Sequence, residues 1–426
     1  MPTTTTIVFM HLPDGPAPAG RLTMTSEPRA SYATFAYGRR YLERADRVPV
    51  DPVQLPLPDP GGEDVVFRTE EGFSNFNGVR DAAPDGWGRY LMYKALDDRE
   101  PSEAEILLAS GDHRVGALAF GPTPARPERL TPWGEGDAPG EHFTLEELAD
   151  AVERVQSVDE LDDNLRRLLT AGSSLGGARP KAATEVQGQP WIAKFPANDD
   201  IYPICRVELA AMRLAKRCGL NVPSLDFREV LGRDIYMIER FDRVATSEGL
   251  RRQPFASGLT ILGAHEGDIG RHTYADLAAA LRQYGADPRA DLVELFRRMV
   301  FNILVTNDDD HLRNHGFLWE SRGWRLSPLY DVVPKPQVGL ERTLVLGVGP
   351  HGRAATLENA IAGAGAFGLS KEEARREVLA LVDTVRDEWA DHFRAAGLGE
   401  AEIRRFATCF RQAGRGRDQL TSDDRE

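Results

Sequence analysis

Stretches of apolar and β-branched residues in the first part of the chain are typical of β-strands. Residues 4–11 and 20–25, rich in Thr, Val and Ile, predict two strands, and residues 115–120 predict a third strand that is buried. The following stretch, 121–141, is dense in Pro and Gly and has no period. It therefore predicts the boundary of a small β-rich N-terminal domain.

A second group of elements follows, beginning with apolar residues at helical spacing. Residues 181–186 and 191–195 predict the two strands of a hairpin, because the Gln-Gly-Gln segment between them favours a tight turn. A helix is predicted over 206–218 and ends at Gly219. From residue 274 onward the pattern is mainly helical. The order of the elements predicts an α+β protein in which strands precede a helical part.

Composition narrows the class of protein. A chain of 426 residues is too long for one ordinary core, so we expect two or three domains. No apolar run reaches the length of a membrane span, the first residues do not resemble a signal peptide, and the three cysteines include no C-x-x-C pair. We therefore expect a cytoplasmic protein that does not bind membranes. The net charge of −14 argues against direct binding to nucleic acid.

The densest group of polar residues follows an apolar helical run, within residues 301–317 (FNILVTNDDDHLRNHGF). Charged groups at the end of a buried helix cost free energy unless they bind a partner. Three interpretations are open: an acidic surface loop, a metal-hydrolase cluster of His and Asp, and the catalytic loop of a kinase. His311 and His315 are two histidines, fewer than a hydrolase metal site often supplies.

The spacing of Asp309 and Asn314 fits the third interpretation. Phosphoryl transfer needs a base near the acceptor hydroxyl, and protein kinases place a magnesium ligand five residues beyond it. Asp331 follows a predicted short strand and supplies the second magnesium ligand of that template, although the sequence there is Asp-Val-Val rather than Asp-Phe-Gly. Asp308 and Asp310 flank Asp309 and make the loop unusually acidic.

Upstream residues could supply the remaining parts of a kinase. Residues 173–181 (SSLGGARPK) are either a plain flexible loop or one whose glycines let backbone N–H groups approach phosphates. Lys194 lies in an apolar strand and needs an anionic partner. Glu208 on the next helix could be that partner, or an ordinary first-turn acid that stabilises the helix dipole. Residues 236–243 (YMIERFDR) predict a connection between lobes whose backbone can bind adenine.

Together these motifs resemble the HipA-like serine/threonine kinases, the toxins of type II toxin–antitoxin modules in bacteria. The resemblance covers nearly the whole chain. In the kinase part it rests on SSLGGARPKA (173–182), WIAKFP (191–196), MIERFDR (237–243), NDDDHLRN (307–314) and SPLYD (327–331). In the N-terminal part it rests on FAYGRRYL (35–42), DAAPDGWGR (81–89) and VGALAF (115–120).

The resemblance implies a role for individual residues. Asp309 would accept the proton of the substrate hydroxyl, and His311 would shape the catalytic loop. Asn314 and Asp331 would hold Mg²⁺. Lys194, paired with Glu208, would bind the phosphates of ATP. The glycine-rich loop would also contact ATP, through Ser173, Ser174, Gly176, Gly177 and Lys181. Backbone groups of Glu239 and Phe241 in the connection would bind adenine.

The resemblance also implies regulation and partners. Ser174 would be autophosphorylated, which silences such enzymes, and the adjacent Ser173 is the other candidate for that modification. The protein substrate would be an aminoacyl-tRNA synthetase or another translation protein. A small helix-turn-helix antitoxin would bind both the kinase and operator DNA.

The fold implied by the resemblance is a small β-rich N-terminal domain followed by a two-lobed protein-kinase-like fold with a mainly helical C-terminal lobe. We expect the N-terminal domain over 1–125, the kinase N-lobe over 126–240, the helical C-lobe over 241–415 and a disordered tail over 416–426. The alternative function is a catalytically weak kinase-fold module that regulates by binding, together with a DNA-binding antitoxin.

Overall fold

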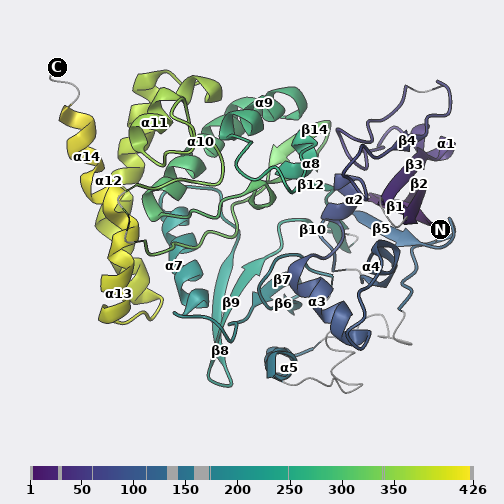
Figure 1. Cartoon of the computed structure of the whole chain (residues 1–426), viewed down its shortest axis with the longest axis horizontal. Helices are drawn as coiled ribbons and strands as arrows, with labels where there is room; N and C mark the ends of the chain where they lie inside the picture. The colour runs from purple at the N-terminus through teal and green to yellow at the C-terminus, as the bar shows by residue number, and fades with distance from the viewer. Residues whose placement is uncertain are drawn as a thin grey trace. The chain divides into compact units, whose positions relative to one another are not determined.

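A computed structural model describes residues 3–26, 31–59, 61–111, 113–131, 143–157, 172, 174–247, 249–337, 339 and 341–422. The chain divides into two compact units. The first comprises Met1–Asn198 and Glu229–His265, and the second comprises Asp199–Arg228 and Glu266–Glu426. Figure 1 labels the elements of each unit.

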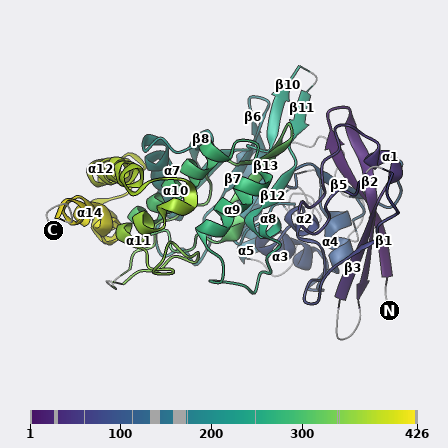
Figure 2. The same cartoon turned by 90° about the horizontal axis from the view of Figure 1, so that it is seen from above.

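The first unit begins with an antiparallel five-stranded sheet in the order β4-β3-β2-β1-β5. Its strands are β1 (Thr3–Leu12), β2 (Gly15–Ser26), β3 (Ser31–Tyr37), β4 (Phe67–Arg68) and β5 (Leu118–Gly121). Figure 2 shows β1 and β2 as a long hairpin. Phe9, Leu22 and Phe35 are fully buried in this sheet. The connecting helices are α1 (Arg39–Leu42), α2 (Asn77–Asp81) and α4 (Glu103–Ala109).

A second sheet in the same unit contains the predicted hairpin. β6 (Lys181–Val186) pairs with β7 (Gln189–Lys194), which pairs with β9 (Arg233–Glu239). The two turn residues have the positive φ that a tight hairpin turn needs, 52° at Gln187 and 78° at Gly188. β8 (Leu225–Val230) is the remaining strand of this sheet and lies beside β9. β10 (Arg243–Thr246), β11 (Gly249–Arg252), β12 (Phe255–Ser257) and the short helix α8 (Gly258–Leu262) follow β9 in the chain.

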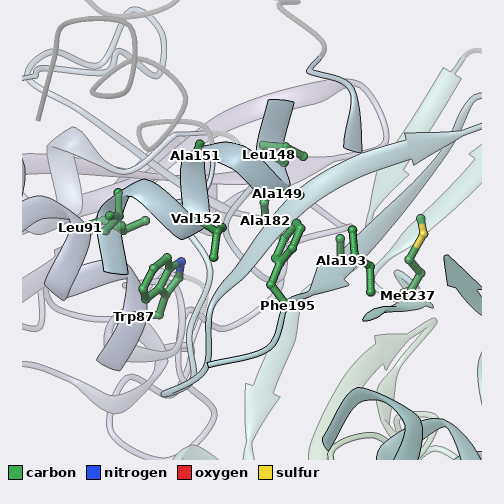
Figure 3. Packing of buried hydrophobic residues seen from close by; sticks show 12 residues of the cluster. Trp87, Leu91, Leu148, Ala149, Ala151, Val152, Ala182, Ala193, Phe195 and Met237 are labelled. Atoms are coloured by element: carbon green, nitrogen blue, oxygen red, sulfur yellow. The ribbon is translucent and has the colours of Figure 1, made fainter. Parts of the chain in front are cut away.

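Two helices pack their apolar faces against this second sheet. α3 (Gly86–Ala95) contributes Trp87 and Leu91, and α5 (Leu145–Ser157) contributes Val152. They meet Phe195 and Met237 from the sheet side in one buried cluster (Figure 3). The N-terminal segment and the second sheet thus share a hydrophobic core.

The second unit is mainly helical. Its helices are α7 (Ile204–Arg217), α9 (Tyr274–Tyr284), α10 (Pro288–Val305), α11 (Leu357–Ala362), α12 (Lys371–Ala395), α13 (Glu400–Phe406) and α14 (Arg411–Ser422). The hairpin of β13 (Gly316–Glu320) and β14 (Gly323–Leu326) follows α10. Short 3-10 turns cover Leu312–Asn314, Ala364–Phe367 and Ala407–Phe410.

α12 organises the helical core. It begins at the capping box of Ser370 and Glu373, which satisfies free backbone N–H groups at the helix start. It buries Val378, Val382 and Val385, and α14 lies alongside it in both views (Figures 1 and 2). α14 extends to Ser422, so residues 416–422 are helical where the sequence predicts a disordered tail. The apolar contact with α12 outweighs the polar composition of this segment.

The predicted α+β class is confirmed, with a β-rich N-terminal region and a helical C-terminal part. Within the part of the chain that the structure describes, no helix combines the length and the apolar character needed to cross a membrane.

Candidate active site

The acidic loop begins where α10 ends. Asp287 caps the first turn of α10 and Pro288 occupies its first position, both of which favour a helix start. Thr306 adopts a left-handed conformation, with φ of 57°, and terminates the helix. Residues 307–311 follow as a loop, so the helix core holds the start of the polar segment in a fixed position.

The three consecutive aspartates meet three different surroundings. Asp310 is buried and accepts hydrogen bonds from the Tyr274 hydroxyl and from His315 Nε2, the latter at 3.0 Å. Asp308 accepts a hydrogen bond from Gln337 Nε2. Asp309 keeps 62% of its side chain exposed. Only Asp309 is therefore presented to solvent as a base would have to be.

Burial of Asp310 tends to raise the pKa of its carboxyl group, because a charge is costly to remove from water. The charge and hydrogen bond of His315, with the hydrogen bond from Tyr274, outweigh burial and hold that pKa below its usual value. Asp310 is consequently an ionised group that supports the loop from inside the fold.

A buried polar network continues beneath the loop. Asn302 Nδ2 donates to the Tyr274 hydroxyl over 3.3 Å, and Asn307 Nδ2 donates to Asn302 Oδ1 over 3.1 Å. Buried polar groups that are satisfied in this way specify one arrangement. The sequence alone does not predict this role for Tyr274 and Asn302, whose only signal is a polar side chain within an otherwise apolar helical face.

The β13–β14 hairpin aligns the two candidate magnesium ligands. Asn314 lies two residues before the hairpin and Asp331 five residues after it, and antiparallel pairing returns the chain to the same end. The Tyr330 hydroxyl also donates to the backbone carbonyl of Arg313 over 2.7 Å. The residues next to both ligands are therefore in direct contact.

These residues suit a hard cation. Asn314 is buried and its Nδ2 donates to the Asp309 carbonyl over 3.2 Å, a hydrogen bond that does not use its Oδ1. A carboxylate and an amide oxygen are donors that Mg²⁺ accepts, usually with phosphate oxygens and water completing the shell. In the described ranges no group of three or more His, Cys, Asp or Glu could hold a metal ion.

Asp331 has a strained backbone. Its φ is 62°, in the left-handed region that side chains other than glycine rarely adopt. Strain of this kind costs about 1–3 kcal/mol and tends to occur at functional sites. His311 is also unusual, because its buried Nδ1 has no hydrogen-bond partner among the described residues. Its backbone N–H donates to the Asp309 carbonyl over 2.9 Å, which tightens the loop.

The glycine-rich loop lies in the first unit, and Ser173 falls outside the described residues. Ser174 is 2% exposed, and its Oγ accepts a hydrogen bond from the Gly111 amide over 2.9 Å. Lys181 Nζ donates to the Gly176 carbonyl over 2.6 Å. In this conformation the hydroxyl of Ser174 is enclosed by protein.

Asp85 and Trp87 of the N-terminal segment form hydrogen bonds with this loop that the sequence alone does not predict. Asp85 accepts a hydrogen bond from the Gly177 amide. The Trp87 backbone amide donates to the Gly177 carbonyl over 2.9 Å, and its indole N–H donates to the Lys181 carbonyl over 3.2 Å. Gly86 permits the approach, because a Cβ there would lie 2.8 Å from the Gly177 carbonyl oxygen. The Asp-Gly-Trp sequence was the available signal.

Lys194 and Glu208 are both nearly buried, at 8% and 1% exposure. Lys194 lies at the end of β7 in the first unit, with Nζ 5.8 Å from the ring centre of Tyr236. Glu208 lies on α7 in the second unit. Both residues remain candidates for the roles that the sequence predicts, and burial of their charges is compatible with those roles.

The predicted adenine-binding connection follows β9. Glu239 is the last residue of β9, and Phe241 is half-buried. Arg240, Asp242 and Arg243, next to these residues in the chain, form a buried ion cluster. In it Asp242 accepts hydrogen bonds from Arg240 at 2.7 and 2.9 Å and from Arg243 at 2.8 Å.

This ion cluster also fixes the turn before β5. Arg240 and Arg243 donate to the Arg114 carbonyl over 3.0 and 2.9 Å, and the Gly116 amide donates to Asp242 over 2.8 Å. Burial tends to raise the pKa of Asp242, but the two guanidinium groups and these hydrogen bonds hold it well below its usual value. The connection is thereby tied to the N-terminal segment.

The family model of the HipA-like C-terminal domain matches residues 173–389, which is just over half of the chain. The chain belongs to this family. The match contains every HipA-like motif that the sequence analysis identified in the kinase part, from the glycine-rich loop to Asp331.

Two relatives of this HipA-like protein extend the comparison. A protein named "Putative kinase Y4mE" from Sinorhizobium fredii is 26% identical over 325 residues, covering 70% of this chain and 71% of the relative. The "Serine/threonine-protein kinase toxin HipA" of Shewanella oneidensis is 25% identical over 285 residues, covering 59% of this chain and 60% of the toxin.

A solved structure shows the same fold. HipA from Shewanella oneidensis, in its complex with HipB and operator DNA, aligns with a TM-score of 0.67 and 17% identity, covering 95% of each chain. The β-rich N-terminal part followed by a kinase-like part is therefore common to both proteins, as predicted.

Proposed function

We propose that the protein is an ATP- and Mg²⁺-dependent serine/threonine protein kinase. The observation that carries the proposal is the end of α10, where an exposed Asp309 is followed by Asn314, with Asp331 returned to the same end of the β13–β14 hairpin. Membership of the HipA-like family and the names of its relatives support the proposal.

In the proposed reaction Asp309 accepts the proton of a protein hydroxyl group. The hydroxyl oxygen forms a bond to the γ-phosphorus of ATP. The bond between that phosphorus and the oxygen leading to the β-phosphate breaks, and this oxygen leaves with the electron pair as part of ADP. Asn314 and Asp331 would hold Mg²⁺, which when bound neutralises phosphate charge.

The remaining assignments stay part of the proposal. Lys194 would bind ATP phosphates and pair with Glu208, the loop with Gly176, Gly177 and Lys181 would cover them, and the backbone of Glu239 and Phe241 would bind adenine. His311 would shape the loop. Ser174 would be the autophosphorylated residue, and because its hydroxyl is enclosed here, the loop would have to leave this position before modification.

Partners follow from the family. We propose an aminoacyl-tRNA synthetase or another translation protein as the substrate. A small helix-turn-helix antitoxin is the proposed partner, which the complex of the Shewanella HipA with HipB and operator DNA supports. The acidic net charge of this chain is consistent with leaving DNA contacts to such a partner.

The test is transfer of label from ATP with Mg²⁺ to protein, with the purified chain alone and with a bacterial lysate. Wild type should label protein and Asp309→Asn should lose the label. Intact-mass spectrometry of the same samples should show one phosphate that Ser174→Ala lacks. If wild type and Asp309→Asn label equally little while calorimetry shows tight ATP binding, the protein is a kinase-fold binding module instead.

A further inference from the structure

A lysine that the kinase template does not include contacts the proposed base. Lys335 lies four residues beyond Asp331, and its Nζ is 3.1 Å from Asp309 Oδ2 and 3.4 Å from Asp308 Oδ1. Across the described residues, no other cationic side chain forms an ion pair with Asp309. The catalytic loop has no lysine of its own between Asp309 and Asn314.

The backbone around Lys335 is held firmly. Its amide donates to the Thr306 carbonyl over 3.0 Å, at the residue that ends α10. Pro334 and Pro336 lie on either side, and a proline ring fixes its own φ and restricts the residue before it. Thr306 is itself fixed, because its hydroxyl donates to the Cys409 carbonyl over 2.6 Å. The ammonium group is thus delivered to Asp309 from a preorganised segment.

The buried guanidinium group of Arg342 also contacts Thr306. Arg342 is 8% exposed and donates to the Thr306 hydroxyl and to the Thr408 carbonyl. The chain from Asp331 onward is therefore attached to the end of α10 at two points, Lys335 and Arg342. These contacts fix the backbone position from which the Lys335 side chain extends to the loop.

Charge and exposure suit Lys335 to a phosphate. Its side chain is 42% exposed, so it faces the same solvent as Asp309. Partial burial tends to lower the pKa of the ammonium group, but the hydrogen bond and charge of Asp309, with the charge of Asp308, raise that pKa above its usual value. The ammonium group of Lys335 is therefore positively charged and lies beside Asp309, next to the place where the transferred phosphoryl group would be bound.

We propose that Lys335 is a catalytic residue that contacts the γ-phosphoryl group of ATP while it holds Asp309. This inference rests on the proposed kinase function. As the phosphorus passes from the ADP oxygen to the acceptor oxygen, negative charge spreads over its three other oxygens, and a preplaced cation stabilises that charge without reorganising. One carboxylate oxygen of Asp309 stays with Lys335, and the other accepts the hydroxyl proton.

The test compares Lys335→Met with wild type at saturating ATP and Mg²⁺. Turnover should fall by about 100-fold, the usual effect of removing one group that stabilises transition-state charge. Calorimetry should show ATP affinity reduced by about tenfold and ADP affinity unchanged, because only ATP carries the γ-phosphate. Lys335→Arg should recover part of both, since the charge remains. Lys371→Met, an exposed lysine at the start of α12, should match wild type.

Other results would contradict the role proposed for Lys335. Wild-type turnover and an unchanged preference for ATP in Lys335→Met would overturn the inference. Equal loss of ATP and ADP affinity would also overturn it, because Lys335 would then only hold the loop. If Lys335→Met fails to fold, the same comparison is made with Lys335→Gln and Lys335→Arg. Absence of transfer by wild type would refute the proposed function instead, and the ATP-to-ADP affinity ratio would still decide the phosphate contact.

Discussion

Asp309 and Asp310 are adjacent in the chain but have different surroundings, because their side chains leave the backbone in different directions. Asp310 points into the protein toward Tyr274 and His315, whereas Asp309 is exposed beside Lys335. Asp242 is a second buried carboxylate, held by Arg240 and Arg243 in the first unit. The ionised state of each of these carboxylates therefore follows from the residues that it contacts.

The ion cluster around Asp242 predicts how the first unit responds to acid. The folded-state pKa of Asp242 lies below its unfolded value of about 3.9, so folding is stabilised by this group above that pH. The stabilisation is lost as the pH falls from about 4 toward the folded-state pKa. Asp242→Asn should cost about 3–5 kcal/mol at pH 7, because Arg240 and Arg243 lose their buried counter-charge.

The measurement is denaturant unfolding of both proteins from pH 3 to 7. The difference in unfolding free energy between wild type and Asp242→Asn should shrink as the pH falls below about 4. Asp387→Asn is the control, because its carboxylate also pairs with an arginine but is exposed. A difference that stays constant with pH would show that the charge of Asp242 is not what stabilises the cluster.

At the scale of elements, the glycine-rich loop is positioned by a helix start rather than by its own sequence. The first turn of α3 supplies Asp85, Gly86 and Trp87, which contact Gly177 and Lys181. Gly86 has φ of 31° and leaves no room for a side chain against the Gly177 carbonyl. Two short segments far apart in the chain therefore act as one structural element.

Gly86→Ala should loosen the glycine-rich loop. The added Cβ would meet the Gly177 carbonyl at 2.8 Å, and an alanine in a left-handed conformation costs about 1–2 kcal/mol in addition. Hydrogen exchange at the Trp87 and Gly177 amides should become faster, by roughly tenfold for each 1.4 kcal/mol lost.

Gly188→Ala provides the matched control for this experiment. Gly188 also has a positive φ, of 78°, but a Cβ there would meet nothing within 4 Å. It should destabilise the β6–β7 turn and leave exchange at Trp87 unchanged. Equal acceleration at Trp87 in both variants would mean that general strain, and not the contact with Gly177, governs the loop.

At the scale of the whole molecule, the proposed ATP ligands belong to both compact units. Lys194 lies in the first unit, whereas Asn314 and Asp331 lie in the second. A ligand that binds only the folded protein stabilises it by about 2.7 kcal/mol at a concentration 100-fold above its dissociation constant. Stabilisation of each unit therefore reports whether its residues contribute to nucleotide binding.

ATP with Mg²⁺ should raise the unfolding midpoint of both units in calorimetric scans. Lys194→Met, in the first unit, and Asp331→Asn, in the second, should each reduce the shift, because each removes a proposed ligand. Lys216→Met on α7 should keep it, since this lysine lies outside the proposed assignments. A nucleotide shift that persists in full in either of the first two variants would exclude that residue from the site.

Local sequence determined much of this protein. The Gln187-Gly188 turn, the capping box at Ser370 and the helix ending before residue 307 follow from the conformational preferences of neighbouring residues. The spacing of Asp309 and Asn314 and the position of Asp331 indicated the kind of site, because a loop of fixed length sets which side chains can approach one ligand. The sequence also predicts a disordered tail over 416–426, whereas residues 416–422 are helical and α14 contacts α12.

Tertiary structure decided the contacts between distant segments. Asp85 and Gly177 are 92 residues apart, Tyr274 and Asp310 are 36 apart, and Lys335 reaches Asp309 only because the chain turns back after Asp331. No local preference encodes such pairs, since each depends on where folded elements bring two side chains together. The sequence thus determined which groups are candidates for the proposed phosphoryl transfer, and the fold decided which of them faces solvent, which is buried as support, and which lysine lies beside Asp309.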